Sequence, residues 1–228
     1  MFDLDNTLLA GDSDYAWTQF LISRGCIDKD AFLARNQDFH RDYCNGELEI
    51  HDYIAFVAEP MQQLWPDKLA ELQADYVEHV RWMMQPAAFD LIARHRERGD
   101  YTMIMTATSN LIAGGICDAF GVDSWIATML EVDAEGITGR INGTPCFQSG
   151  KRTLLQSWLR KRPQFSFDNV WFYSDSHNDL PLLEAVGKPV AVDPDAALEE
   201  RAHKRGWPIV SLRDENITEI PHAETETA

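Results

Sequence analysis

After Pro86 the chain alternates between helix-length segments and short apolar runs, and this alternation limits the possible folds more than any other feature. The helical patterns cover residues 87–98, 110–120, 151–159 and 179–186, and the short runs cover residues 101–105, 125–128, 170–173 and 189–192. Alternating helices and buried strands favour the α/β class, with an open, doubly wound and mainly parallel (Rossmann-like) sheet. Residues 131–141, with Glu135-Gly136 at the turn, predict a β-hairpin.

Residues 11–85 show helical spacing of apolar residues and contain no β-rich run. We therefore expect an α/β core formed by residues 1–10 and 86–212, an inserted helical cap at 11–85, and a polar tail at 213–228. The expected cap helices begin near Asp12 and cover about 30–43, 47–57 and 66–84, with breaks at Pro60 and Pro66. Ligands of such sheets bind beyond the carboxyl ends of the strands, where a cap can act as a lid.

Composition excludes several classes of partner. The 228 residues carry a formal net charge of -17, which argues against binding to nucleic acid or to an anionic membrane surface. No apolar run is long enough to cross a membrane. The four cysteines form no Cys-x-x-Cys pair, so a zinc or redox motif is not indicated. We expect a cytoplasmic, thiol-reduced protein, and its oligomeric state is left open.

Two carboxylates, Asp3 and Asp5, stand two residues apart at the end of the first apolar run. Alternate side chains of a strand share a face, so both acids would point to one side of the chain. They repel each other unless a cation or a proton lies between them. Carboxylates of this kind suit Mg2+, which keeps waters that a phosphate can replace. The alternative is a strand end followed by an ordinary turn.

Three further polar sites follow predicted strands. Thr106-Ala107-Thr108-Ser109 offers hydroxyls and backbone N–H groups suited to phosphate oxygens, although a plain helix N-cap would look the same. Lys151 opens a predicted helix and can neutralise charge on a phosphoryl group. Asp175 and Asp179 lie in a loop that suits a metal site or, alternatively, simply caps the next helix; His177 between them has no obvious partner.

The order and spacing of these four sites resemble the haloacid dehalogenase superfamily of phosphohydrolases. The helical segment after the first site, and a hairpin with Ile-Thr-Gly-Arg at 137–140 followed by Gly150-Lys151, resemble its phosphoserine phosphatase-like branch (subfamily IB). The sequence Asp-Ser-Asp-Tyr-Ala-Trp at 12–17 is similar to bacterial histidinol-phosphatase-type proteins of that branch.

The resemblance implies a Mg2+-dependent phosphatase that acts on a small phosphorylated metabolite. Asp3 would attack phosphorus and carry an aspartyl-phosphate, and Asp5 would act as general acid and base. Mg2+ would be held by Asp3, the Asp5 backbone carbonyl and Asp175, and Asp179 would help to order the metal's waters and Lys151. The phosphoryl oxygens would be bound by Thr106, the Ala107 N–H and Lys151, with Asn178 lining the site.

Asp12 lies nine positions after Asp3, where this branch places a carboxylate that binds the substrate's amino group. The alternative role is a plain helix N-cap. The resemblance thus implies a small amino-alcohol phosphate, with histidinol phosphate ahead of phosphoserine, because the second motif reads Thr-Ala-Thr-Ser where phosphoserine phosphatases usually carry Ser-Gly-Gly. A carboxylate-bearing substrate would want an arginine from the cap, which Arg35 or Arg41 could supply.

Three alternatives stay open from the sequence. A phospho-receiver domain also uses acids, a hydroxyl and a lysine around Mg2+, but it needs about half this length and no helical insertion. A catalytically dead phosphate-binding relative is disfavoured because both Asp3 and Asp5 are present. A phosphotransferase on the same scaffold differs only in the acceptor. Only Met1 and Phe2 precede Asp3, so we also expect the native protein to carry residues upstream.

Overall fold

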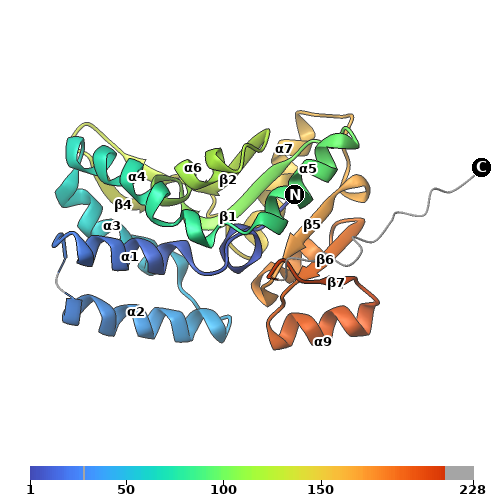
Figure 1. Cartoon of the computed structure of the whole chain (residues 1–228), viewed down its shortest axis with the longest axis horizontal. Helices are drawn as coiled ribbons and strands as arrows, with labels where there is room; N and C mark the ends of the chain where they lie inside the picture. The colour runs from blue at the N-terminus through green and yellow to red at the C-terminus, as the bar shows by residue number, and fades with distance from the viewer. Residues whose placement is uncertain (28, 214–228) are drawn as a thin grey trace, which may run out of the picture.

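The computed structural model describes residues 1–27 and 29–213, and it shows a parallel sheet with helices on both faces and a helical cap at one side (Figure 1). The helices of the cap gather at the left of the view, and the last strands lie with α9 at the right. The predicted α/β class, with an inserted helical cap, is therefore confirmed. All of the expected polar tail beyond Arg213 lies outside the described residues, and the domain boundaries stay a prediction.

The parallel sheet has two parts that the first residues of the chain join. The strands are β1 (Met103–Ser109), β2 (Ser124–Thr128), β5 (Trp171–Ser174), β6 (Lys188–Val192) and β7 (Ile209–Val210). Strand β1 pairs with β2, and β5, β6 and β7 follow one another in that order. Phe2 bridges in parallel to Ile104 of β1 and to Tyr173 of β5. Because the Asp3 N–H donates to the Tyr173 carbonyl at 2.8 Å, Asp3 follows directly after this central position.

Alternating strand residues face two hydrophobic clusters on opposite sides of the sheet. Ile104 and Tyr173 belong to the cluster that includes the cap, whereas Met105 and Phe172 belong to the other. The first face is covered by α5 (Pro86–Glu97) and α6 (Asn110–Ala119), and the second by α7 (Ser149–Arg160), α8 (Leu180–Leu183) and α9 (Ala196–Arg205). This two-sided burial explains why the strands appear in the sequence as continuous apolar runs.

The cap consists of α1 (Ser13–Ser23), α2 (Lys29–Cys44), α3 (Ile50–Leu64) and α4 (Asp67–His79). The hairpin is present as antiparallel β3 (Leu130–Val132) and β4 (Ile137–Ile141), and Gln62 of α3 donates to the Ile137 carbonyl at 3.0 Å. The expected break at Pro60 is wrong, because Pro60 lies inside α3. Its ring is buried, so packing outweighs the lost helical hydrogen bond. Within the described residues, no helix is both long and apolar enough to span a membrane.

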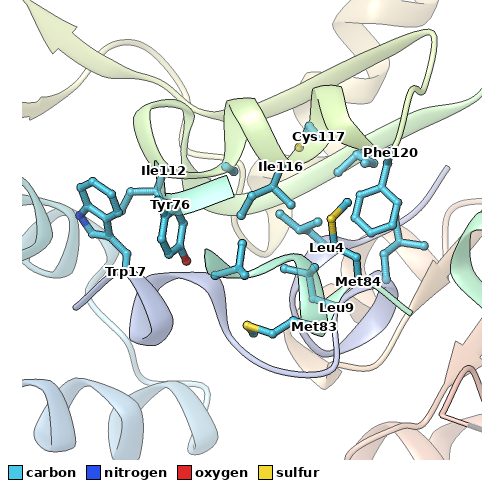
Figure 2. Close-up of a cluster of buried hydrophobic side chains, with 14 of the residues drawn as sticks. Leu4, Leu9, Trp17, Tyr76, Met83, Met84, Ile112, Ile116, Cys117 and Phe120 are labelled. Carbon is cyan, nitrogen blue, oxygen red and sulfur yellow. The ribbon is translucent and has the colours of Figure 1, made fainter. Parts of the chain in front are cut away.

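Cap and core share one buried cluster, which holds α1 beside the first residues of the chain (Figure 2). Trp17 of α1 packs edge to face on Tyr76 of α4, with ring centroids 4.9 Å apart. The Tyr76 hydroxyl donates to the carbonyl of Ser13, at the first turn of α1. Leu4 is fully buried in the same cluster. The start of α1 is therefore held beside Asp3 and Asp5 by packing from both parts of the molecule.

Candidate active site

Asp3 and Lys151 meet at the carboxyl end of the central strands. The Lys151 ammonium donates to Asp3 Oδ1 at 2.8 Å and to Asp179 Oδ2 at 2.7 Å, and all three side chains are buried. Ser174 also donates to Asp179 Oδ2, at 2.7 Å. Gly150 permits this arrangement because a Cβ there would clash with the carbonyl oxygen of Pro145. The structure thus brings Asp3, Lys151 and Asp179 together at one place.

The electrostatics of this group are governed by burial. Burial is the largest effect on Asp3 and raises the pKa of its carboxyl to about 7, against the lowering effect of Lys151. Burial alone would lower the pKa of Lys151, but Asp179 and Asp3 raise it well above its ordinary value. Lys151 is therefore held as a cation, and a further positive charge nearby would lower the pKa of Asp3.

Asp175 is the next carboxylate at this edge of the sheet. Thr7 Oγ1 donates to Asp175 Oδ1 at 3.0 Å and accepts from the Asp175 N–H at 3.0 Å. Burial, followed by repulsion from Asp3, raises the pKa of Asp175 well above its ordinary value. The sequence reasoning missed Thr7, although its place four residues after Asp3 put it in the same turn. Its hydroxyl fixes the carboxylate that faces Asp3.

The Asp5 carboxylate is oriented by hydrogen bonds from the start of α1 and from β1. Its Oδ1 accepts from the Ser13 N–H at 2.6 Å, and its Oδ2 accepts from Thr108 Oγ1 at 2.9 Å and from Thr106 Oγ1 at 3.3 Å. Asn6, with φ of +53°, turns the chain immediately after Asp5. The carboxylate thus points toward the start of α1, while the chain leaves the sheet.

These groups line a cavity of about 970 Å3 between core and cap. The core supplies Asp3, Asp5, Ala107, Lys151 and Asp175, and the cap supplies side chains from α1, α2 and α3. The aromatic and histidine residues on the cavity wall are Tyr15, Phe39, His40, Tyr43, Tyr53, Phe147 and His177. Ala107 lies on the wall as expected, whereas Thr106 is fully buried behind it and contacts Asp5. A small organic phosphate fits a cavity of this size.

Asp12 and Asp14 form the acidic wall of the cavity at the start of α1. Asp12 is half-buried and caps the helix, because its Oδ1 accepts from the Tyr15 N–H at 2.8 Å. Burial and the nearby Asp5 raise the pKa of Asp12 to about 7. The N-cap role, which the sequence left as an alternative, is therefore present, and Asp12 also lies on the cavity wall.

Asn178 was expected to line the site, and its side-chain amide makes contacts between the cap and the core. Its amide donates to the Tyr43 carbonyl at 3.2 Å and accepts from Gln148 Nε2 at 3.0 Å. Tyr43 in turn donates from its hydroxyl to Ser176 Oγ at 3.2 Å. Asn178 faces the end of α2 because the loop after β5 turns there, so its contacts fasten the cap to the core. It is absent from the cavity wall formed by the described residues.

His177 has a partner that the sequence did not reveal. Its Nδ1 lies 2.7 Å from Asp195 Oδ2, and its backbone N–H donates to the same oxygen at 2.7 Å. Asp195 also caps α9 through its other oxygen. Since 18 residues separate the two, only the return of the chain through β6 brings them together.

The two arginines considered for a substrate carboxylate point elsewhere. Arg35 pairs with Glu59 at 3.2 Å and lies over the Phe56 ring, and Arg41 pairs with Asp38 at 2.9 Å. Among the described residues that line the cavity there is no arginine, and the lysine is Lys151. A substrate carboxylate therefore finds no arginine on this wall.

Among residues 1–27 and 29–213, no three His, Cys, Asp or Glu side chains converge into a ready-made metal cage. Two carboxylates that repel each other, Asp3 and Asp175, are nevertheless present, and burial disfavours charge on both. Their oxygens are the donors that Mg2+ prefers, and Mg2+ commonly uses one or two carboxylates together with waters and substrate phosphate. The residues present therefore fit Mg2+ of this open type.

Similarity to known proteins defines the class of this chain. The family model of the haloacid dehalogenase-like hydrolases matches residues 1–184. The chain therefore belongs to that family, and its fold and relatives place it in the phosphoserine phosphatase-like branch. It is 40% identical over 217 residues to a histidinol-phosphatase of Neisseria meningitidis, a match that covers 93% of this chain and 98% of the relative.

The chain is also similar to other proteins, whose names differ. A phosphoserine phosphatase of Mycobacterium tuberculosis, SerB1, is 30% identical over 93% of this chain and 70% of its own length. The structure of a protein of unknown function from Bordetella pertussis Tohama I is 38% identical, with a TM-score of 0.84 over 92% of this chain and 96% of that one. A substrate-bound phosphoserine phosphatase shares the fold, with a TM-score of 0.65 at 15% identity over 88% of each chain.

Proposed function

We propose that this phosphatase hydrolyses a small amino-alcohol phosphate through an aspartyl-phosphate on Asp3, with histidinol phosphate as the favoured substrate. The observation that carries the proposal is the buried contact between Lys151 and Asp3 in a cavity whose opposite wall is acidic. The first feature suits an anionic phosphoryl group, and the second suits a cationic substrate group.

In the first step, the Asp3 oxygen that Lys151 leaves free attacks phosphorus, and the bond from phosphorus to the leaving alcohol breaks. Asp5 gives its proton to that alcohol oxygen. In the second step, Asp5 takes a proton from a water whose oxygen attacks phosphorus, and the bond to Asp3 breaks to release inorganic phosphate. Asp5 is suited to both roles because Ser13 and Thr108 fix its carboxylate at the cavity wall.

Lys151 and the second motif hold the phosphoryl oxygens in this proposal. The Lys151 ammonium lies beside the nucleophile, and Ala107 lies on the cavity wall. Thr106 contributes through Asp5, which its hydroxyl contacts. Asp179 keeps Lys151 charged and oriented, because it accepts from both Lys151 and Ser174.

The Mg2+ of this proposal would be held by Asp3, Asp175 and the Asp5 backbone carbonyl, with Asp179 supporting its waters. When bound, it supplies positive charge to the transferring phosphoryl group. Thr7 orients Asp175 for this role through its two hydrogen bonds.

Two observations favour histidinol phosphate. The described cavity wall contains acids at Asp12 and Asp14 but no arginine, which suits a substrate with an amine and no carboxylate. Phe39, Tyr43 and Tyr53 offer flat surfaces on which an aromatic ring can pack. The similarity to the Neisseria meningitidis histidinol-phosphatase supports the same substrate.

Phosphoserine is the second candidate, because SerB1 of Mycobacterium tuberculosis is named as its phosphatase. The two are separated by kcat/KM for histidinol phosphate, phosphoserine and a simple alkyl phosphate, measured with Mg2+ by release of inorganic phosphate. We expect histidinol phosphate to lead by at least about tenfold, since the alkyl phosphate lacks the ammonium and the carboxylate of phosphoserine would face the acidic wall. A lead for phosphoserine would replace the substrate proposal but keep the phosphatase.

The non-enzyme alternatives predict a different result in the same assay. A phospho-receiver domain is not supported, because the hydrolase family model covers residues 1–184. A catalytically dead phosphate-binding relative would release no phosphate from any of the three compounds. Adding excess glycerol as an acceptor, and looking for glycerol phosphate, separates hydrolysis from phosphotransfer.

A further inference from the structure

Asp14 is a buried carboxylate that the mechanism does not use. It lies on the cavity wall, and its residue is only 6% exposed. Its Oδ2 accepts from the Tyr53 hydroxyl at 3.1 Å and lies 3.3 Å from Thr108 Oγ1, whose one hydrogen goes to the nearer Asp5 Oδ2 at 2.9 Å. Its Oδ1 is buried and has no hydrogen-bond partner in the part of the chain that the structure describes. One half of this carboxylate is therefore firmly held, and the other half is unsatisfied.

No cationic side chain in the part of the chain that the structure describes pairs with Asp14. It takes part in no ion pair with the lysines, arginines and histidines of residues 1–27 and 29–213. Asp5 and Asp12 lie close by and add repulsion to the effect of burial. A buried carboxylate in this position is costly unless a proton or a cation accompanies it. A ligand with a positive charge would meet that need from within the cavity.

Asp12 is less suited to the same task. Its Oδ1 is engaged with the Tyr15 N–H as the helix cap, and its side chain is more exposed than that of Asp14. An ion pair gains strength when solvent is excluded from it. Tyr53 of α3 donates to Asp14 and Thr108 of β1 contacts it, so its position is set before the ligand arrives.

We propose that Asp14, rather than the helix-capping Asp12, is the residue that binds the ammonium group of the substrate and sets the preference for amine-bearing phosphates. The inference rests on the proposed phosphatase function and deepens it. It makes Tyr53 a positioning residue, because its hydroxyl holds the carboxylate from the cap. It also links substrate charge to the catalytic acid, since Thr108 contacts both Asp14 and Asp5.

The rival role for Asp14 is purely structural. A protonated Asp14 would tie α1 to α3 through Tyr53 and to the core through Thr108, with no contact to substrate. Asparagine is nearly isosteric with a neutral aspartic acid and would satisfy that role. The structural role therefore predicts that Asp14→Asn leaves substrate preference unchanged, whereas the ammonium-binding role predicts that it does not.

The test compares 2-aminoethyl phosphate with propyl phosphate, which differ by an ammonium in place of a methyl group. We expect the wild type to favour the amine in kcat/KM by at least about tenfold. In Asp14→Asn that ratio should fall to within about threefold of unity, while in Asp12→Asn it should stay close to the wild-type ratio. Circular dichroism and thermal unfolding establish that each variant is folded.

If Asp14→Asn does not fold, Tyr53→Phe decides the question, and we expect the amine preference to fall by about threefold because Asp14 loses the hydrogen bond from Tyr53. An unchanged ratio in the folded Asp14→Asn, or a loss in Asp12→Asn instead, would overturn the inference. A wild type that hydrolyses both compounds equally well would also overturn it but would leave the phosphatase intact. A wild type that hydrolyses no phosphomonoester with Mg2+ would contradict the proposed function and this inference together.

Discussion

The Lys151 ammonium lies 2.8 Å from Asp3 Oδ1 although 148 residues separate the two in the chain. The pair is buried, and Asp179 completes it with a second contact to Lys151. Removing the lysine would leave two buried carboxylates without their cation, so the contact serves stability as well as chemistry.

We predict that Lys151→Met lowers the free energy of unfolding by about 3–5 kcal/mol, the usual effect of breaking a buried pair from one side. Activity toward p-nitrophenyl phosphate should fall by at least about 100-fold, because a group that stabilises transition-state charge is lost. Urea unfolding and steady-state kinetics measure the two effects. Lys161→Met, at the exposed end of the same helix, is the matched control, and an equal effect there would contradict this role.

Asp5→Asn should lower kcat/KM, which reports only the first step, by about 100- to 10,000-fold for a simple alkyl phosphate, since an alkoxide leaves poorly without a proton. The loss should be much smaller for p-nitrophenyl phosphate, whose leaving group needs little help. Asparagine can still accept from the Ser13 N–H, so the local geometry is preserved. Equal losses for the two substrates would show that Asp5 does not transfer the proton.

Asp175→Asn should raise the Mg2+ concentration needed for half-maximal activity by more than about 100-fold, and Thr7→Val by about 10- to 100-fold, as for residues that only support a ligand. We expect the smaller effect for Thr7→Val because Thr7 acts through its two hydrogen bonds to Asp175. Activity titrated with Mg2+ after removal of metal by EDTA gives both values. Activity of the wild type that persists in EDTA would remove the metal from the mechanism.

Asp12 should make the protein less stable as the pH rises. Its pKa is raised from the ordinary 3.8 to about 7 by burial and by Asp5, so the folded state binds the proton more tightly than the unfolded state. This contribution to stability is complete below about pH 4 and is lost as the pH rises through about 7. Asp12→Asn keeps a good helix cap but removes the titration.

The urea midpoint of the wild type, measured in EDTA, should therefore fall more steeply between pH 5 and 8 than that of Asp12→Asn. Asp90→Asn, at an exposed position of α5, should follow the wild type. Parallel curves for the wild type and Asp12→Asn would mean that Asp12 titrates normally in the folded protein.

The sequence predicts those parts of the site whose residues stand at the ends of recognisable strands or at the start of a helix. Asp3 and Asp5 stand at the end of an apolar run, and Lys151 follows a glycine at the start of a helix, so their place at the strand ends follows from the alternation of helices and strands. The rest depends on which loops meet. Thr7 and Asp175 are 168 residues apart, and only the parallel pairing of the first residues with β5 brings them together.

Two other features that the sequence did not reveal have the same origin. Pro60 was expected to break a helix because proline removes a backbone donor, but the buried surface of α3 outweighs that local cost. Asn178 was expected on the cavity wall, yet its amide is taken up by Gln148 and by the carbonyl of Tyr43 at the end of α2. Contacts between an inserted cap and its core have no signature in the local sequence.

In the proposed mechanism Asp3 carries the phosphoryl group, and chemical trapping of this aspartyl-phosphate identifies the residue that carries it. Enzyme quenched in acid during turnover, reduced with borohydride and digested should show an aspartate converted to homoserine at position 3 by peptide mass spectrometry. We expect this product in the wild type with Mg2+, and we expect neither product nor turnover in Asp3→Asn. Conversion at another aspartate, or substantial turnover by folded Asp3→Asn, would contradict the account.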